Sequence, residues 1–230
     1  MASEVSKGKY NLICVAHPDD ETIFFGGLIL RKEANRLPWV VLCVTSDGNE
    51  DRKRQFHEAC DALGVDSPMW WGFPDRYEQR LNVNELSERL RAEFSNPPEN
   101  IYTHCIIGEY GHPHHQDVSF AVHTAFRDHP RVFAVAYNAY PDFTIALSEA
   151  DFEKKSYILT KIYGSETSRF LNVLPSTFVE GFLRLDYDEV DLLYSYFARP
   201  ESLSLDVNRL KKYRWLTDYL PRLRGLPRPF

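Results

Sequence analysis

Two short segments of the chain concentrate side chains that bind metals and move protons. The first, Ala16–Glu21 (AHPDDE), places a histidine and three acids directly after an apolar run. His17 and Asp20 are three residues apart, so one helical turn can direct both side chains to the same side. Asp19 lies between them and must project at another angle. One carboxylate can therefore bind a metal ion while its neighbour stays free to accept a proton.

Ordinary helix capping explains only part of this segment. Asp and Glu are favoured in the first turn of any helix, and for Glu21 alone we take that as the explanation. Capping does not explain His17 or the two acids crowded beside it, because close carboxylates repel one another and shift their pKa values. A divalent cation at this place would remove the repulsion.

The second segment, Gly108–His115 (GEYGHPHH), holds three histidines within four positions. His112 and His115 are again three residues apart, and Pro113 suits the first turn of a helix. His114 should point elsewhere. The isolated histidines of the chain are interpreted as ordinary core or surface residues; these are His57, His104, His123 and His129.

The rest of the sequence predicts the elements that position these segments. Short apolar runs alternate with helical stretches, a pattern that indicates βαβ units with right-handed crossovers. We expect an α/β, Rossmann-like three-layer fold with a mostly parallel sheet of order 3-2-1-4-5 and helices on both faces. The strands are expected at 11–16, 39–45, 68–73, 101–107 and 131–139, and the helices at 22–33, 53–63, 83–94 and 115–127. After Pro141 the pattern weakens to a helix at 150–163 and a strand at 178–185.

This topology brings the two segments together. In the expected strand order, strands one and four are neighbours at the switch point, where the carboxyl ends of the strands face one crevice. His17, Asp20 and His115 can then form a three-ligand site with an open fourth position, which is typical of catalytic zinc. One Zn²⁺ per chain is expected, and the mixed imidazole and carboxylate donors also accept Fe²⁺ or Mn²⁺.

Such a site favours hydrolysis. A bound metal lowers the pKa of its water to roughly 7 and polarises a carbonyl. Asp19 can take the proton of that water as a general base. His112, one turn from a ligand, can stabilise the oxyanion or protonate the leaving group. The best match is an amide, because its departing nitrogen needs a proton.

Composition limits the other function classes. The 230 residues are interpreted as one domain, residues 1–230, with a core at about 10–185 and an extension of unknown role at 186–230. A net charge of −6 argues against nucleic acid as a partner. No apolar run is long enough to span a membrane, and the first ten residues are too polar for a signal peptide. The four cysteines form no CxxC pair, which favours a reduced, cytoplasmic protein.

The remaining expectations concern the end of the chain and its partners. From residue 207 the sequence is basic around Trp215 and Tyr219 and predicts a solvated helix that packs these two rings, followed by a Pro-rich tail; a contact with a partner or an anionic surface is the alternative. The expected partner is a small molecule, with neither nucleic acid nor a membrane, and homo-oligomer formation stays open. The first strand–helix turn lacks GxGxxG, which disfavours dinucleotide binding.

Both motifs resemble those of the LmbE-like, or PIG-L, family of zinc-dependent N-acetylglucosaminyl deacetylases. AHPDDE and GEYGHxxH match the two family signatures. Weaker similarities include VTSDG (Val44–Gly48) and GFPD (Gly72–Asp75), and the resemblance covers about residues 10–185. It implies zinc bound to His17, Asp20 and His115, Asp19 as general base, His112 as the acid or electrophilic partner, Tyr110 polarising the substrate carbonyl, and Asp75 and Arg52 contacting the sugar.

Two positions depart from the family pattern. His114 stands where an acidic residue often lies between the motif histidines, and Gln55 replaces the glutamate of an Arg-x-x-Glu pattern that begins at Arg52. A neutral imidazole cannot serve as a counter-charge, so we expect the pKa of His112 to be lower than in relatives. Asp75, after Pro74, also fits an ordinary turn position.

The leading hypothesis is a zinc-dependent hydrolase that removes the acetyl group from an N-acetylglucosamine-type sugar or conjugate. The alternatives are another metal-dependent C–N amidase, of the thiol-conjugate type, and a catalytically silent metal-binding or sugar-binding module. A silent module would not need Asp19.

Overall fold

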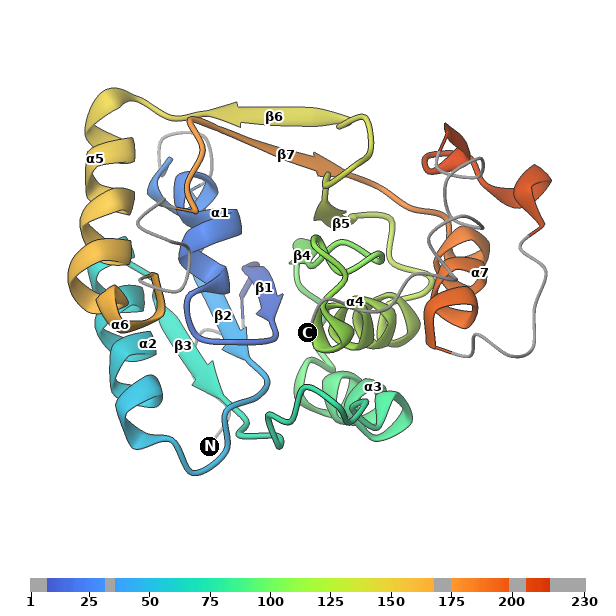
Figure 1. Ribbon diagram of the computed structural model, residues 1–230, viewed down its shortest axis with the longest axis horizontal. Coiled ribbons are helices and arrows are strands. Elements are labelled where there is room, and N and C mark those ends of the chain that lie inside the picture. The colour runs from blue at the N-terminus through green and yellow to red at the C-terminus, as the bar shows by residue number, and fades with distance from the viewer. Residues whose placement is uncertain (1–7, 32–35, 168–174, 199–205, 216–230) are drawn as a thin grey trace.

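A seven-stranded sheet forms the centre of the molecule, with helices on both faces (Figure 1). The computed structural model describes residues 8–31, 36–167, 175–198 and 206–215, and every count below refers to these ranges. The strands are β1 (Asn11–Val15), β2 (Trp39–Cys43), β3 (Ser67–Trp70), β4 (Asn100–Thr103), β5 (Val132–Val135), β6 (Phe143–Ala146) and β7 (Val179–Leu183). Their order is β3-β2-β1-β4-β5-β7-β6.

Seven α-helices surround this sheet in the described ranges. They are α1 (Asp20–Leu30), α2 (Glu50–Leu63), α3 (Val83–Glu93), α4 (Pro113–Ala125), α5 (Glu149–Tyr157), α6 (Gly164–Thr167) and α7 (Tyr187–Ala198). A π-helical turn, Ile158–Ile162, continues α5, and a short 3₁₀ turn covers Val207–Arg209.

The alternating side chains of β1 divide the apolar core between the two faces of the sheet. All five residues of β1 are buried, as the apolar run predicts for a central parallel strand. Ile13 and Val15 pack in one cluster with side chains from α1, α2 and the π-helical turn. Leu12 and Cys14 pack on the other face with side chains from α3 and α4. Helices α1 and α2 therefore cover one face of the sheet, and α3 and α4 cover the other.

The expected strand order is confirmed, and the structure extends it. β3-β2-β1-β4-β5 are parallel neighbours, so β1 and β4 lie side by side at the switch point. β7 then pairs antiparallel with both β5 and β6. The mixed sheet thus carries two strands beyond the order 3-2-1-4-5.

The boundaries differ from the expected ones where the chemistry lies. α1 begins at Asp20 instead of residue 22, and α4 begins at Pro113 instead of residue 115. β4 ends at Thr103, and the expected strand residues 104–107 form a turn instead. The sequence placed both starts too late because the first-turn residues are polar, and propensity alone favours such residues at a cap over a helical position. The candidate ligands Asp20 and His115 therefore lie on helical first turns.

The sequence did not predict β6 or α7. β6 has four residues and alternates between half-buried and exposed positions, which is too short a signal to separate from a loop. α7 packs beside α4, and its residues Val190 and Leu193 belong to the same core cluster as those of α1. Of the expected basic helix, the described part holds only the 3₁₀ turn and residues up to Trp215. Tyr219 and the rest of it lie outside the described residues.

A buried ion pair between α5 and β7 holds α1 against these two elements. Lys155 of α5 and Glu180 of β7 lie 2.7 Å apart, and neither side chain is more than 2% exposed. Glu180 also accepts the backbone N–H groups of Gly27 and Leu28 in α1, at 2.7 and 2.9 Å. Because α1 begins with Asp20, this contact fixes the helix that carries a candidate ligand.

The four cysteines lie free and buried. Within the described ranges, no helix combines the length and apolar character that crossing a bilayer requires.

Candidate metal centre

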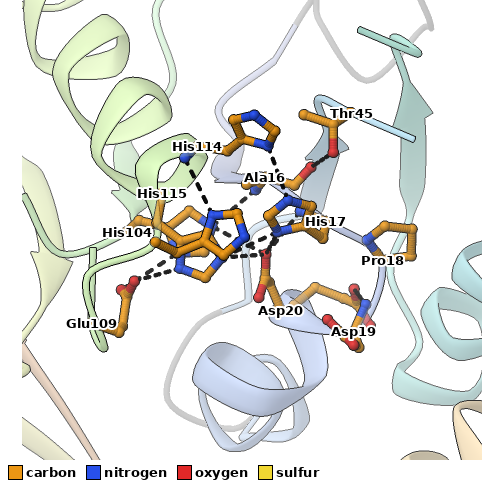
Figure 2. A network of polar contacts seen from close by, with 12 residues as sticks. Ala16, His17, Pro18, Asp19, Asp20, Thr45, His104, Glu109, His114 and His115 are labelled. Carbon is orange, nitrogen blue, oxygen red and sulfur yellow. Dashed lines mark hydrogen bonds and ion pairs between the residues drawn. The ribbon is translucent and has the colours of Figure 1, made fainter. Parts of the chain in front are cut away.

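The structure brings the two polar segments together at the carboxyl ends of β1 and β4 (Figure 2). Asp20 opens α1 and His115 lies in the first turn of α4; both are almost fully buried. His17 lies in the turn after β1, and its backbone N–H donates to Asp20 Oδ2 at 2.8 Å. This bond orients the carboxylate toward the imidazole three residues before it.

Three donor atoms of these residues face one another at nearly equal distances. His17 Nδ1 lies 3.1 Å from His115 Nε2 and 3.3 Å from Asp20 Oδ2. His115 Nε2 lies 3.4 Å from the same carboxylate oxygen. Zinc bonds of about 2.0–2.2 Å in a tetrahedron place neighbouring donors about 3.3–3.6 Å apart. The three donors therefore fit a tetrahedral metal ion that keeps a fourth position.

Glu109 holds His115 in the orientation that this site requires. Its Oε2 lies 2.6 Å from His115 Nδ1, and its Oε1 accepts the backbone N–H of Cys105 at 2.7 Å. The carboxylate thus keeps a hydrogen on Nδ1 and leaves Nε2 of His115 as the lone-pair donor. Burial opposes the charge of Glu109, but His104 and His115 outweigh it and lower its pKa to about 2. The sequence did not predict this role, and its one local signal is an acid six residues before a candidate ligand.

His104 is buried, as expected of a core histidine, but it also belongs to the site. Its Nε2 accepts the backbone N–H of Ala16 at 2.9 Å and lies 3.3 Å from Asp20 Oδ2. Its ring stacks on that of His115 with centroids 3.9 Å apart. Its Nδ1 lies 3.3 Å from Glu109 Oε1, so Nδ1 carries the hydrogen of the ring and Nε2 keeps the lone pair. His104 therefore packs beneath the donor atoms and supports them.

Asp19 adopts an unusual backbone conformation beside the donors. Its φ of 109° lies in a region that side-chain-bearing residues rarely adopt. Glu21 Oε2 accepts its backbone N–H at 3.0 Å. Arg52 Nη2 lies 3.4 Å from Asp19 Oδ2 and also hydrogen-bonds the carbonyl of Pro18. These contacts hold Asp19, whose side chain is 2% exposed, in a strained conformation of the kind that functional sites often show.

Arg52 and Glu21 are more deeply embedded than the sequence indicated. The Arg52 side chain is only 12% exposed and lies between Asp19 and Glu166. The burial of Arg52 opposes its charge, but these two carboxylates raise its pKa. Glu21 was interpreted as an ordinary helix-start residue. It is in fact fully buried, accepts the hydroxyl of Tyr163 at 3.0 Å, and has its pKa raised by burial to about 6.

His112 caps α4 with its own ring. Nδ1 accepts the backbone N–H of His114 at 3.2 Å, which leaves Nε2 to carry the hydrogen of the neutral imidazole. Burial, followed by the nearby rings of His115 and His17, lowers the pKa of His112 to about 2. The ring lies against that of His17, with centroids 4.6 Å apart. His112 is therefore a neutral hydrogen-bond donor beside the candidate ligands.

Two tyrosines border His112 at the mouth of the site. Tyr110 is 55% exposed, and its ring meets those of His112 and His115 edge-on at 6.0 and 5.6 Å. Tyr77, which no sequence motif indicated, is 40% exposed, and its ring centroid lies 5.1 Å from that of His112. Exposed rings of this kind can pack against the apolar face of a sugar.

Asp75 and His114 lie on the far side of His17. Asp75 Oδ1 is 3.4 Å from His17 Nε2, and its Oδ2 accepts the hydroxyl of Ser46 at 3.1 Å. His114 Nδ1 is 3.3 Å from the same nitrogen of His17. Gln55, the other departure from the family pattern, donates to the carbonyl of Ile162 at 2.9 Å and thus packs on the π-helical turn.

The chain is similar to known proteins over the part that holds both motifs. The PIG-L family model, described as GlcNAc-PI de-N-acetylase, matches residues 12–126, half of the chain, and that range includes both motifs. The N-acetylglucosaminyl-phosphatidylinositol de-N-acetylase of Bos taurus is 30% identical over 128 residues, which cover 51% of this chain and 50% of that protein. The 1D-myo-inositol 2-acetamido-2-deoxy-alpha-D-glucopyranoside deacetylase 1 of Saccharopolyspora erythraea is 29% identical over 171 residues, covering 53% and 56%.

The chain thus spans about half the length of the curated relatives it matches. Among solved structures, the conserved protein TT1542 from Thermus thermophilus is similar with a TM-score of 0.56 and 22% identity. That match covers 77% of this chain and 94% of the other. It establishes the likeness of fold.

Proposed function

Because the chain belongs to the PIG-L family, we propose that it is a zinc-dependent de-N-acetylase that hydrolyses the acetamide of an N-acetylglucosamine-type sugar or sugar conjugate. The observation that carries the proposal is the set of three donor atoms, from His17, Asp20 and His115, at mutual distances of 3.1–3.4 Å. They support one Zn²⁺ with a free coordination place. The two curated relatives named above are deacetylases of N-acetylglucosamine conjugates by name, which supports the same substrate class here.

Zinc in this place would supply a Lewis acid and a water of lowered pKa. The chain itself supplies the proton transfers. Asp19 accepts a proton as the water oxygen bonds to the carbonyl carbon, and Arg52 holds the Asp19 carboxylate in position. His112 presents Nε2–H to the carbonyl oxygen as negative charge develops there. When the C–N bond breaks, the nitrogen takes the proton that Asp19 accepted from the water and leaves as an amine, while the acetyl group leaves as acetic acid, which ionises to acetate.

The mouth of the site supports a sugar as the substrate. Tyr110 and Tyr77 present half-exposed rings next to His112, where a pyranose could pack while its acetamide reaches the donors. Asp75 is 39% exposed and can accept a sugar hydroxyl. Tyr110 is the residue proposed to polarise the substrate carbonyl.

A release assay tests the function directly. Purified protein would be incubated with N-acetylglucosamine and with its inositol and phosphatidylinositol conjugates, and free amine would be measured with chelator and after zinc is restored. We expect amine release from at least one N-acetylglucosamine compound, loss of release with chelator, and recovery with zinc. Release from thiol-conjugated amides alone would favour the amidase alternative, and release that chelator does not affect would contradict the zinc site.

Asp19→Asn separates the chemistry from metal binding. Asn tolerates a positive φ, so this variant should keep the backbone conformation while removing the base. We expect about one zinc per chain to remain and the rate to fall at least ~10²-fold, as for loss of a general base. Asp51→Asn, at an exposed position on α2, is the matched control and should keep the wild-type rate. An unchanged rate in Asp19→Asn would remove this residue from the mechanism.

A further inference from the structure

The candidate ligand His17 has a second ring nitrogen, and its surroundings are unusual. When Nδ1 gives its lone pair to a cation, the neutral ring carries its hydrogen on Nε2. That hydrogen needs an acceptor. Two acceptors lie within reach: Asp75 Oδ1 at 3.4 Å and His114 Nδ1 at 3.3 Å. Asp75 and His114 also lie 3.4 Å from each other, so both converge on the one N–H group.

The contacts of His114 determine which of its nitrogens is the acceptor. Its Nε2 lies 3.1 Å from the carbonyl of Arg76 and 2.9 Å from the carbonyl of Gln79. Carbonyls only accept hydrogen bonds, so Nε2 carries the hydrogen and Nδ1 of the neutral ring holds the lone pair. The side chain is fully buried. His114 therefore bridges the ligand His17 and the backbone of the loop between β3 and α3.

The same loop is fastened to the first turns of α4 by further contacts. Arg80 donates to the carbonyl of Pro113 and to Gln116, both at 2.9 Å. Asp117 accepts the backbone N–H of Leu81 at 2.9 Å. The loop over residues 75–81, which carries Asp75 and Tyr77 at the mouth of the site, is thus joined to the helix that bears His115.

From this geometry we propose that Asp75 and His114 are positioning residues for zinc, and that they couple the occupancy of the metal site to the order of the loop at residues 75–81. Acceptors for the second nitrogen of a ligating histidine orient its ring and raise its basicity, and their loss typically costs 10–100-fold in metal affinity. Binding is reciprocal. Zinc should therefore order the loop to the extent that the loop supports zinc.

Zinc affinity of the purified full chain, measured by competition with a chromophoric chelator, tests the first half of the proposal. Asp75→Asn removes the charged acceptor and should weaken zinc binding about 10–100-fold. His114→Gln retains an amide donor for the loop carbonyls but has no acceptor in the Nδ1 position, so it should weaken zinc binding as well. Asp47→Asn is the matched control: it removes a carboxylate near the same sheet edge that makes no described contact with His17. It should bind zinc within twofold of wild type.

Hydrogen exchange of the amides in residues 76–81 tests the second half. In the wild type, zinc should slow their exchange. His114→Asn retains an acceptor in the Nδ1 position but cannot reach the two loop carbonyls, so it should bind zinc more tightly than His114→Gln yet lose most of the zinc-dependent protection. Thermal unfolding of the metal-free variants identifies any that fail to fold. In that case Ser46→Ala, which removes only the hydroxyl that supports Asp75, replaces Asp75→Asn.

The inference rests on the zinc site of the proposed function, and the outcomes separate the two. A wild-type chain that binds no zinc would overturn the proposed function. A chain that binds zinc and releases amine, but whose Asp75→Asn and His114→Gln variants both retain wild-type zinc affinity, would overturn only the coupling. Exchange in residues 76–81 that does not respond to zinc would overturn it too.

Discussion

Replacement of Lys155 by methionine should destabilise the fold by leaving a carboxylate unpaired in the core. The Lys155 and Glu180 side chains are 0% and 2% exposed and lie 2.7 Å apart. Methionine retains an unbranched apolar stem of similar shape, so the change removes mainly the charge. Among the residues that the structure describes, Glu180 would then keep its bonds to the backbone N–H groups of Gly27 and Leu28 alone.

The expected loss is about 3–5 kcal/mol of the free energy of unfolding, as for other buried pairs that lose one partner. At roughly 2–4 °C per kcal/mol for a chain of this size, the melting temperature should fall by about 6–20 °C. Urea denaturation at pH 7 measures the first quantity and calorimetry the second. Both should be measured on the metal-free protein, because zinc binding would add its own stabilisation.

The double variant Lys155→Met/Glu180→Gln is the matched control. It contains no buried charge and should recover at least half of the loss, because an unpaired charge costs more than a missing pair. The direction of the pH dependence follows from Glu180, whose pKa is raised by burial even with Lys155 present. A carboxyl group whose pKa is higher in the folded protein stabilises the fold at pH values below its unfolded pKa. This stabilisation is lost as the pH rises through the folded pKa. The loss of unfolding free energy in Lys155→Met, relative to wild type, should therefore become smaller toward acid pH. A deficit below about 1 kcal/mol at pH 7, or an equal deficit in the double variant, would refute the reasoning.

Three further predictions follow from individual contacts. Glu109→Gln should weaken zinc binding about 10–100-fold in chelator competition, because it disrupts the carboxylate that orients His115. Burial raises the pKa of Glu21 from 4.5 to about 6. Between pH 4 and 7, the free energy of unfolding of the wild type should therefore fall by about 2 kcal/mol relative to that of Glu21→Gln in denaturant titrations. A difference between the two proteins that does not change with pH would contradict this. Gly27→Ala should lower stability by about 1–2 kcal/mol despite the usual helix gain of alanine, because a Cβ there would lie 2.4 Å from Leu147; a stabilised variant would show that Leu147 moves freely.

The local sequence was informative where residues act through neighbours in the chain. The apolar run at β1 predicted a strand buried on both faces, and its alternation with helical stretches predicted the parallel order of the first five strands. The spacing of His17 and Asp20 predicted that a single turn brings the two side chains together, as it does at 3.3 Å. The short strand β6 escaped prediction because four residues carry too little periodicity.

The supports of the site could not be predicted, because they join residues that are far apart in the chain. His104 meets Ala16 across 88 positions, and Glu180 meets Gly27 across 153. No local pattern encodes such a pairing, since it depends on which strands become neighbours and which helix faces them. His104 alone resembles any buried histidine, and Glu180 alone resembles a solvated acid on a strand.

The sequence by itself determined which side chains could carry the chemistry and which two strand ends would present them. Periodicity and spacing are properties of adjacent residues, and these set the strands, the helical first turns and the donor types. Only the tertiary structure decided how the donors are held: the carboxylate of Glu109 on His115, Asp75 and His114 on the second nitrogen of His17, and Arg52 on Asp19. The physical reason is that a buried polar group must find a partner wherever the fold places one, and that place is fixed only when the sheet is assembled.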